Sequence, residues 1–216
     1  ICRVLEIYMA NISYIAFREQ FFKYGCFCSN QVNLCHKDFD VNNYTRWCKQ
    51  GLLIRLRQSW YAFAECLMMP DFARYIAAKI YKPSYISLHT ALSFYGMIPE
   101  AVVSINSVTT LKPLSFNNKF GEYTYQHIKP SLFFGFDLKK MDDGRAIPFA
   151  TPEKALLDLL YLYPMYKTTE DMLELRLDED FIKEEMKIEQ LNDYLKIFNN
   201  KALTTRVNTL KKAYGL

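Results

Sequence analysis

Amides and cations that could contact the edges of nucleic-acid bases gather on one side of a helix predicted over residues 41–50. Apolar side chains recur there at spacings of three and four, at Val41, Tyr44, Trp47 and Cys48, and should face the core. Asn and Arg can both form bidentate hydrogen bonds with purines. The candidate contacts on the polar side are Asn42, Asn43, Thr45, Arg46 and Lys49. A solvated face on a protein-binding module is the alternative.

A hairpin is predicted directly after this helix, from strands at residues 52–56 and 60–64. Alternation places Ile54 and Leu56 on one side of the first strand, and Arg55 and Arg57 on the other. The tip carries Arg57, Gln58 and Ser59, which would touch a phosphate backbone or a minor groove.

Charge separates the two parts of the chain. The protein has 216 residues and a net charge of +4. Residues 1–64 hold eight Lys and Arg against four Asp and Glu, and the remainder holds nineteen of each. The whole excess therefore lies in the N-terminal part, which favours a polyanionic partner for it and weakens the alternative of a solvated face.

The elements that would position these residues predict an α+β protein. The N-terminal part has the predicted layout of a winged helix-turn-helix, which is three helices followed by the hairpin. The helices are one over residues 12–24, a short second one capped by Ser29, and the third one capped by Asp40. The predicted domains are residues 1–64 and 71–216, with 65–70 as a linker. Residues 1–12 could add one more helix.

The larger domain is predicted to be mixed α/β. β-Branched and aromatic runs predict a small, mainly antiparallel sheet, with a last strand at 146–149. These runs are at residues 102–110, 114–116, 123–128 and 132–136. Thr151 caps a nearly apolar helix that should form a buried spine, and the C-terminal end is helical. The aromatic residues of 123–136 favour a packed sheet face over a nucleic-acid stacking platform, because few cations are interleaved with them.

No metal, cofactor or catalytic activity is predicted. Cys26, Cys28, Cys35 and His36 lack the paired C-x2-C spacing of zinc sites, so reduced buried thiols are the preferred interpretation and zinc the minor one. The chain has no Gly-rich phosphate loop, no H-E-x-x-H and no G-x-S-x-G, and its three His are scattered.

Four stretches resemble the antitoxin of AbiE-type, type IV abortive-infection toxin-antitoxin systems. They are PSYISLHTALSFYGMIPE (83–100), SVTT (107–110), GEYTYQHIKPSLFFGF (121–136) and PEKALLDLLYL (152–162). YTRWCKQGLLIRLRQSWYAF (44–63) resembles the helix-wing junction of that family, and the likeness covers about residues 12–165. The cysteine-rich segment 26–35 and the acidic segment 170–189 depart from it.

The resemblance implies an antitoxin for phage defence whose N-terminal domain binds double-stranded promoter DNA at inverted repeats and represses its own operon. It also implies a co-encoded nucleotidyltransferase toxin as functional partner, blocked by the C-terminal domain without necessarily forming a tight complex. Two alternatives stay open: a stand-alone winged-helix transcriptional regulator with a C-terminal sensor domain, and an enzyme acting on nucleic acid. We expect a cytoplasmic protein with no membrane partner, because no apolar run or signal peptide is apparent.

Overall fold

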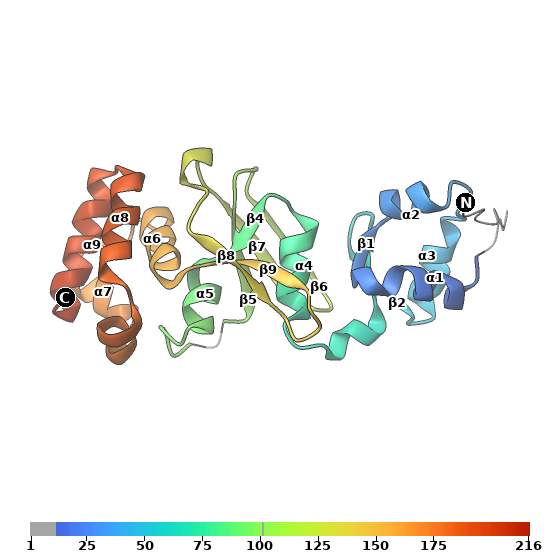
Figure 1. The fold of residues 1–216 in the computed structure, drawn as a ribbon, viewed down its shortest axis with the longest axis horizontal. Helices are drawn as coiled ribbons and strands as arrows, with labels where there is room; N and C mark the ends of the chain where they lie inside the picture. Colours follow the sequence, from blue (N-terminus) through green and yellow to red (C-terminus); the bar gives the residue numbers. More distant parts are fainter. Residues whose placement is uncertain (1–11, 101) are drawn as a thin grey trace, which may run out of the picture. The chain divides into compact units, whose positions relative to one another are not determined.

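The structure, a computed structural model, describes residues 12–100 and 102–216 (Figure 1). It divides into two compact units. The first contains the chain up to Phe72 together with Asn117–Phe120, and the second contains Ala73–Phe116 and Gly121–Leu216. The helix suggested for the first twelve residues lies almost wholly outside the described residues. Within the described residues, no helix combines the length and the apolar character needed to cross a bilayer.

The first helix of the first unit, α1, spans Tyr14–Phe21. It begins where the Ser13 hydroxyl accepts a hydrogen bond of 3.2 Å from the Ala16 amide. A 3₁₀ turn at Phe22–Tyr24 continues it, and Gly25 ends it with φ 66°. The helix predicted over residues 12–24 is therefore present, with its last turn tightened.

Two more helices follow, α2 at Ser29–Cys35 and α3 at Asn42–Lys49. Ser29 was predicted as the cap of the second helix, but it is the first helical residue. Cys28 holds the cap position instead, and its amide donates to the Gln31 side chain at 3.0 Å. The cap was misplaced because a serine is a common helix cap, whereas here the strand runs directly into the helix.

A three-stranded antiparallel sheet completes the first unit. Its strands are β1 (Cys26–Cys28), β2 (Leu53–Arg57) and β3 (Trp60–Phe63), in the order β1-β3-β2. The hairpin was predicted and β1 was not, because three residues show no alternation. The predicted linker also has structure, since Ala64–Met68 form a 3₁₀ helix.

An aromatic cluster fills the core of this unit. Phe17 is fully buried, and its ring lies 4.7 Å from that of Phe21, 4.8 Å from Trp47 and 5.2 Å from Phe27. These rings come from α1, α3 and β1, so the cluster fixes α3 against the rest of the unit.

The second unit is built on a six-stranded sheet. The strand order is β6-β7-β5-β4-β9-β8. The strands are β4 (Ser84–Ile86), β5 (Ser104–Thr109), β6 (Leu114–Asn118), β7 (Gly121–His127), β8 (Phe136–Lys140) and β9 (Ala146–Ala150).

The sheet is mixed, which corrects the prediction of a small, mainly antiparallel one. β5 runs parallel to β7 and β4 parallel to β9, whereas the β4–β5 and β8–β9 pairs are antiparallel. The central strand β4 was missed because it is only three residues long and follows Pro83. The predicted strand at 132–136 is instead a 3₁₀ turn at Pro130–Leu132 and a loop leading into β8.

Helices cover both faces of this sheet. α4 (Phe72–Ile80) packs on the face that carries Tyr125, whose hydroxyl donates to the Ala77 carbonyl at 2.8 Å. α5 (Leu88–Phe94) packs on the opposite face, where Thr90 bonds the β5 backbone. α6 (Pro152–Leu162) lies on that face too, in contact with α5 and β9.

α6 is the predicted buried spine. Thr151 caps it, with its hydroxyl 3.3 Å from the Lys154 amide, and eight of its eleven residues are buried. The helical C-terminal end is likewise present, as α7 (Thr169–Glu174), a π-helical turn at Phe181–Glu185, α8 (Ile188–Phe198) and α9 (Lys201–Tyr214). Figure 1 shows α6 between the sheet and these helices, so it is enclosed from both sides.

Candidate nucleic-acid interface

Helix α3 separates its buried and exposed side chains along its length. Tyr44 and Trp47 are 4% and 2% exposed, and they anchor the helix to the aromatic core. Four of the predicted contact residues are exposed on the other side: Asn42, Thr45, Arg46 and Lys49. The Asp40 carboxylate accepts a hydrogen bond of 2.9 Å from the Asn42 amide and so fixes the first turn.

Asn43 is the exception, and its predicted place on the exposed face is wrong. Its side chain is only 1% exposed, so it cannot reach a ligand directly. Its Oδ1 accepts a hydrogen bond of 2.5 Å from Nη2 of Arg46, one helical turn further on. Asn43 therefore orients a surface guanidinium from below, a role that residue type and spacing did not reveal.

A hollow on the surface joins α3 to β2. It encloses about 330 Å³, and its walls include three predicted contact residues, Thr45, Lys49 and Arg55. Tyr44, Cys48 and Tyr61 complete the lining. The rings of Tyr44 and Tyr61 stack with centroids 4.5 Å apart and planes 9° apart, which makes this part of the hollow rigid.

The electrostatics of the hollow leave two cations facing neutral groups. Burial raises the pKa of Tyr44, and it raises the pKa of Tyr61 more than the neighbouring Arg55 lowers it. Burial also raises the pKa of the Cys48 thiol, against the opposing charge of Arg55. The phenols and the thiol therefore stay protonated at neutral pH, and the charges of Lys49 and Arg55 are not cancelled by a lining acid.

The β2–β3 turn carries the remaining predicted residues. Gln58 and Ser59 are exposed, and Arg57 is half-buried where it pairs with Trp60 across the hairpin. Ser59 adopts φ 62°, a left-handed conformation that costs free energy for a residue with a Cβ. Its carbonyl accepts a hydrogen bond of 2.9 Å from the Ser29 amide, so the turn is tied to the start of α2. This hairpin tip is short and held in place.

One cation of this unit comes from a distant part of the sequence. Lys119 belongs to the first unit, and its charge opposes, without overcoming, the effect of burial that raises the pKa of the Cys48 thiol. Near it, the Asn118 side-chain amide donates to the Leu56 carbonyl at 3.2 Å. No sequence signal links residues 117–120 to α3, because the association arises only on folding.

The cysteine-rich segment forms no cluster suited to a metal. Cys26 is buried, Cys28 half-buried and Cys35 exposed, and all three cysteines are reduced. The His36 ring hydrogen-bonds with the Gln20 side chain at 2.5 Å. Across residues 12–100 and 102–216, no three His, Cys, Asp or Glu side chains are grouped as metal ligands.

The aromatic residues of β7 lie inside the second unit, as the packed-face interpretation predicts. Tyr123 is 0% exposed and Tyr125 is 1% exposed. Their rings stack on that of Phe116 in β6, at 4.8 and 6.1 Å. These side chains are therefore not available to stack on bases.

The α3–β2 surface is thus the place where the predicted contact residues meet. It combines an exposed helix face, a two-cation hollow and a tethered hairpin turn. A search of protein-family models and of curated proteins finds no match to this chain, so the assignment of the surface depends on its own geometry.

Proposed function

We propose that the first unit is a winged helix-turn-helix that binds double-stranded DNA. The order α1, β1, α2, α3, β2, β3, with β1 paired to β3, supports this assignment because it is the order of elements in such modules. In this proposal α3 enters the major groove, and the β2–β3 turn is the wing that contacts backbone phosphate.

The observation that carries the proposal is the shared surface of Thr45, Lys49 and Arg55. A helix face and a neighbouring strand present two cations around one hollow, with no acid in its lining. In this proposal, phosphate contacts from such cations set the orientation on the duplex, while Asn42 and Arg46 would read base edges. The buried Asn43 would act through Arg46 and not on DNA.

We further propose that the chain is the antitoxin and autorepressor of a type IV toxin-antitoxin pair. The support is the resemblance of four stretches to AbiE-type antitoxins, and all four lie in the second unit: residues 83–100, 107–110, 121–136 and 152–162. The second unit would block a co-encoded nucleotidyltransferase toxin, and the first would bind inverted repeats in the promoter. No catalytic step is assigned to either.

The test pairs a binding assay with a growth assay. In Lys49→Ala/Arg55→Ala, fluorescence anisotropy with the chain's own promoter duplex should show affinity reduced by about tenfold or more, and the log-log salt slope reduced by about 2. Lys23→Ala/Lys37→Ala removes the same charge from exposed positions outside the hollow and is the matched control. Equal losses in the two variants would contradict a defined DNA-binding surface.

The same variants separate the two roles of the chain. When co-expressed with the adjacent gene, Lys49→Ala/Arg55→Ala should still restore growth, because rescue is assigned to the second unit. Loss of rescue in a variant that remains folded by circular dichroism would contradict this division. If the adjacent gene product is not toxic, the antitoxin assignment fails while the DNA-binding assignment is still decided by the anisotropy data.

A further inference from the structure

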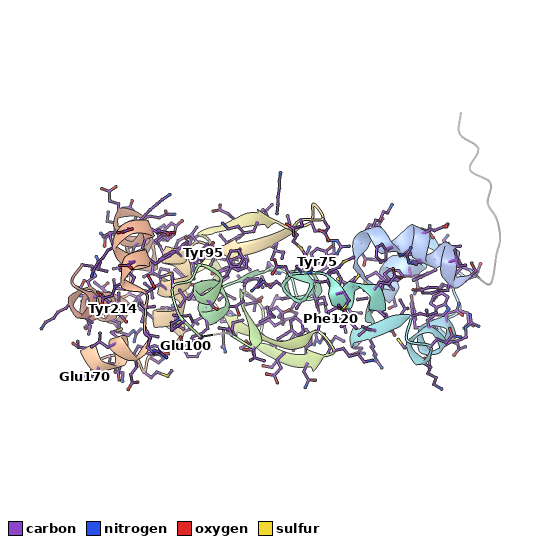
Figure 2. The ribbon with its side chains drawn as sticks, turned by 90° about the horizontal axis from the view of Figure 1, so that it is seen from below. Tyr75, Tyr95, Glu100, Phe120, Glu170 and Tyr214 are labelled. Atoms are coloured by element: carbon purple, nitrogen blue, oxygen red, sulfur yellow. The ribbon has the colours of Figure 1, made fainter. Side chains whose placement is uncertain are left out.

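The second unit contains a cavity with a mixed polar and apolar lining that the proposed function does not use. It encloses about 310 Å³, within the lower range of small-molecule sites. Its lining comes from α5, the loop after it, β5, the loop after α6, and the end of α7: His89, Ile98, Glu100, Val102, Ser104, Asn106, Tyr166, Glu174 and Leu175. Glu100 is labelled in Figure 2.

The inner wall of this cavity is held by a hydrogen-bond network. Asn106 is 8% exposed, and its side-chain amide donates to the hydroxyls of Thr124 at 2.8 Å and Ser104 at 3.1 Å. The Thr90 hydroxyl donates to the Ser104 carbonyl at 2.9 Å and accepts from the backbone amide of Asn106 at 2.8 Å. The side chains of the polar wall are therefore held in fixed orientations before any ligand binds.

The two residues before His89 are held in place by a hydrogen bond and by burial. The Ser87 hydroxyl donates to the buried Asp158 carboxylate at 2.8 Å, and Leu88 is fully buried with φ 57°. A left-handed leucine persists only where its surroundings enforce it. This arrangement places the imidazole of His89 at the cavity, and its ring packs edge-on against Tyr163 with centroids 5.9 Å apart.

His89 presents a neutral imidazole to the cavity. Burial lowers its pKa more than the charge of Glu100 raises it, so the ring is uncharged at neutral pH. Within residues 12–100 and 102–216, neither ring nitrogen of His89 forms a hydrogen bond with another residue, unlike those of His36 and His127. One nitrogen of a neutral imidazole is an acceptor.

The charge of the lining is negative. It contains two carboxylates, Glu100 and Glu174, and neither Lys nor Arg. Arg176 pairs with Glu100 at 3.3 Å, but both side chains of that pair are largely exposed, so the pairing is weak. The Tyr166 ring adds a surface on which a cation can rest.

We propose that this cavity binds a small organic cation, a primary ammonium or guanidinium group on a short carbon chain. The cationic head lies between Glu174 and Glu100 over Tyr166, donates to the His89 imidazole, and the chain lies along Ile98 and Leu175. This inference is independent of DNA binding by the first unit and can be tested with the full chain.

The test uses three four-carbon probes whose end groups are cationic, neutral and anionic: 1,4-diaminobutane, 1,4-butanediol and succinate. In calorimetric titration of the full chain, the diamine should bind with a dissociation constant of about 10 mM or below, and the other two at least about tenfold more weakly. Failure of the diamine to bind, or equal binding of the diol or succinate, overturns the proposal.

A matched pair of variants locates the binding. Glu174→Gln should weaken the diamine by about fivefold, whereas Glu184→Gln removes an exposed carboxylate outside the cavity and should leave the affinity unchanged. In an NMR titration the His89 ring resonances should shift with the diamine. An equal loss in both variants indicates nonspecific attraction to an acidic protein surface and also overturns the proposal.

Discussion

Replacing Lys154 by methionine tests how much the buried ion pair of α6 contributes to stability. Lys154 and Asp158 are both 0% exposed and pair directly at i and i+4. The Lys154 ammonium also donates to the Tyr85 hydroxyl at 2.8 Å, and that hydroxyl donates to Asp158 at 2.9 Å. Methionine fills a similar volume, so the substitution removes the charge and leaves the packing nearly intact.

The expected loss follows from the carboxylate left behind. Removing one partner of a buried ion pair costs about 3 to 5 kcal/mol, and the hydroxyls of Tyr85 and Ser87 still donate to Asp158, so we expect about 3 kcal/mol. Lys154→Met/Asp158→Asn should recover most of this loss, because a neutral amide still accepts from both hydroxyls and leaves no buried charge.

The loss should also depend on pH with a defined sign. Burial raises the pKa of the Asp158 carboxyl, against the charge of Lys154. Without that ammonium the pKa in the folded protein rises further above its unfolded value of 3.8. The folded variant then binds more protons than its unfolded chain, so its deficit is smallest near about pH 4 and grows toward about pH 7.

Urea unfolding followed by far-UV circular dichroism measures this effect, since most helices lie in the second unit. Trp fluorescence supplies a second signal, because both tryptophans, Trp47 and Trp60, lie in the first unit. Lys183→Met removes an exposed ammonium that pairs with Glu179 at 2.7 Å, also at i and i+4, and should change nothing measurable. Equal effects of Lys154→Met and Lys183→Met would refute the reasoning, and so would a double variant no more stable than Lys154→Met.

Three smaller perturbations follow from backbone and side-chain geometry. Gly135→Ala should cost about 1 to 3 kcal/mol more than Gly144→Ala in thermal unfolding: both have positive φ, but only at Gly135 would a Cβ meet a buried lysine side chain, at 3.0 Å. Asn43→Ala should lower the free energy of unfolding by about 1 kcal/mol, because its buried amide accepts from Arg46. Asn42→Ala should leave stability unchanged and weaken promoter binding in anisotropy. A loss of stability in Asn42→Ala and not in Asn43→Ala would exclude the indirect role of Asn43. Ser59→Gly should raise the free energy of unfolding by about 0.5 to 1 kcal/mol, because glycine adopts φ 62° without strain. The measurement is the urea midpoint, which should rise; a lower midpoint would contradict this prediction.

The sequence predicted the candidate surface where local periodicity determines the structure. Spacings of three and four correctly placed Tyr44 and Trp47 inside and Arg46 and Lys49 outside. The same rule failed at two positions. Val41 was predicted to face the core but is 60% exposed, because it is the N-cap and precedes the helix. Asn43 is buried because a neighbouring guanidinium supplies a hydrogen bond to its side-chain oxygen. A count of polar residues on a helix face cannot detect that pairing.

Long-range features of the second unit were beyond local patterns. The helix at Pro152–Leu162 was predicted from its cap and its leucines, yet the buried pair of Lys154 and Asp158 within it was not, since its partners Tyr85 and Ser87 lie about 70 residues away in sequence. The order of strands in the sheet also differs from their order in the sequence. β7 pairs in parallel with β5, so β6, which lies between them in sequence, is an edge strand of the sheet. Such pairings depend on packing of the whole sheet, which single-strand signals do not encode.

The division of the chain into units also bears on how fragments should be designed. Because residues 117–120 group with the first unit, the chain passes from one unit to the other three times. A fragment that stops at residue 72 would lack Phe120, whose ring lies 5.3 Å from that of Phe72, as well as the Asn118 amide that bonds the Leu56 carbonyl. Dissecting this protein by simple truncation would therefore expose apolar surface and an unpaired strand end, and point substitutions in the intact chain are the sounder route.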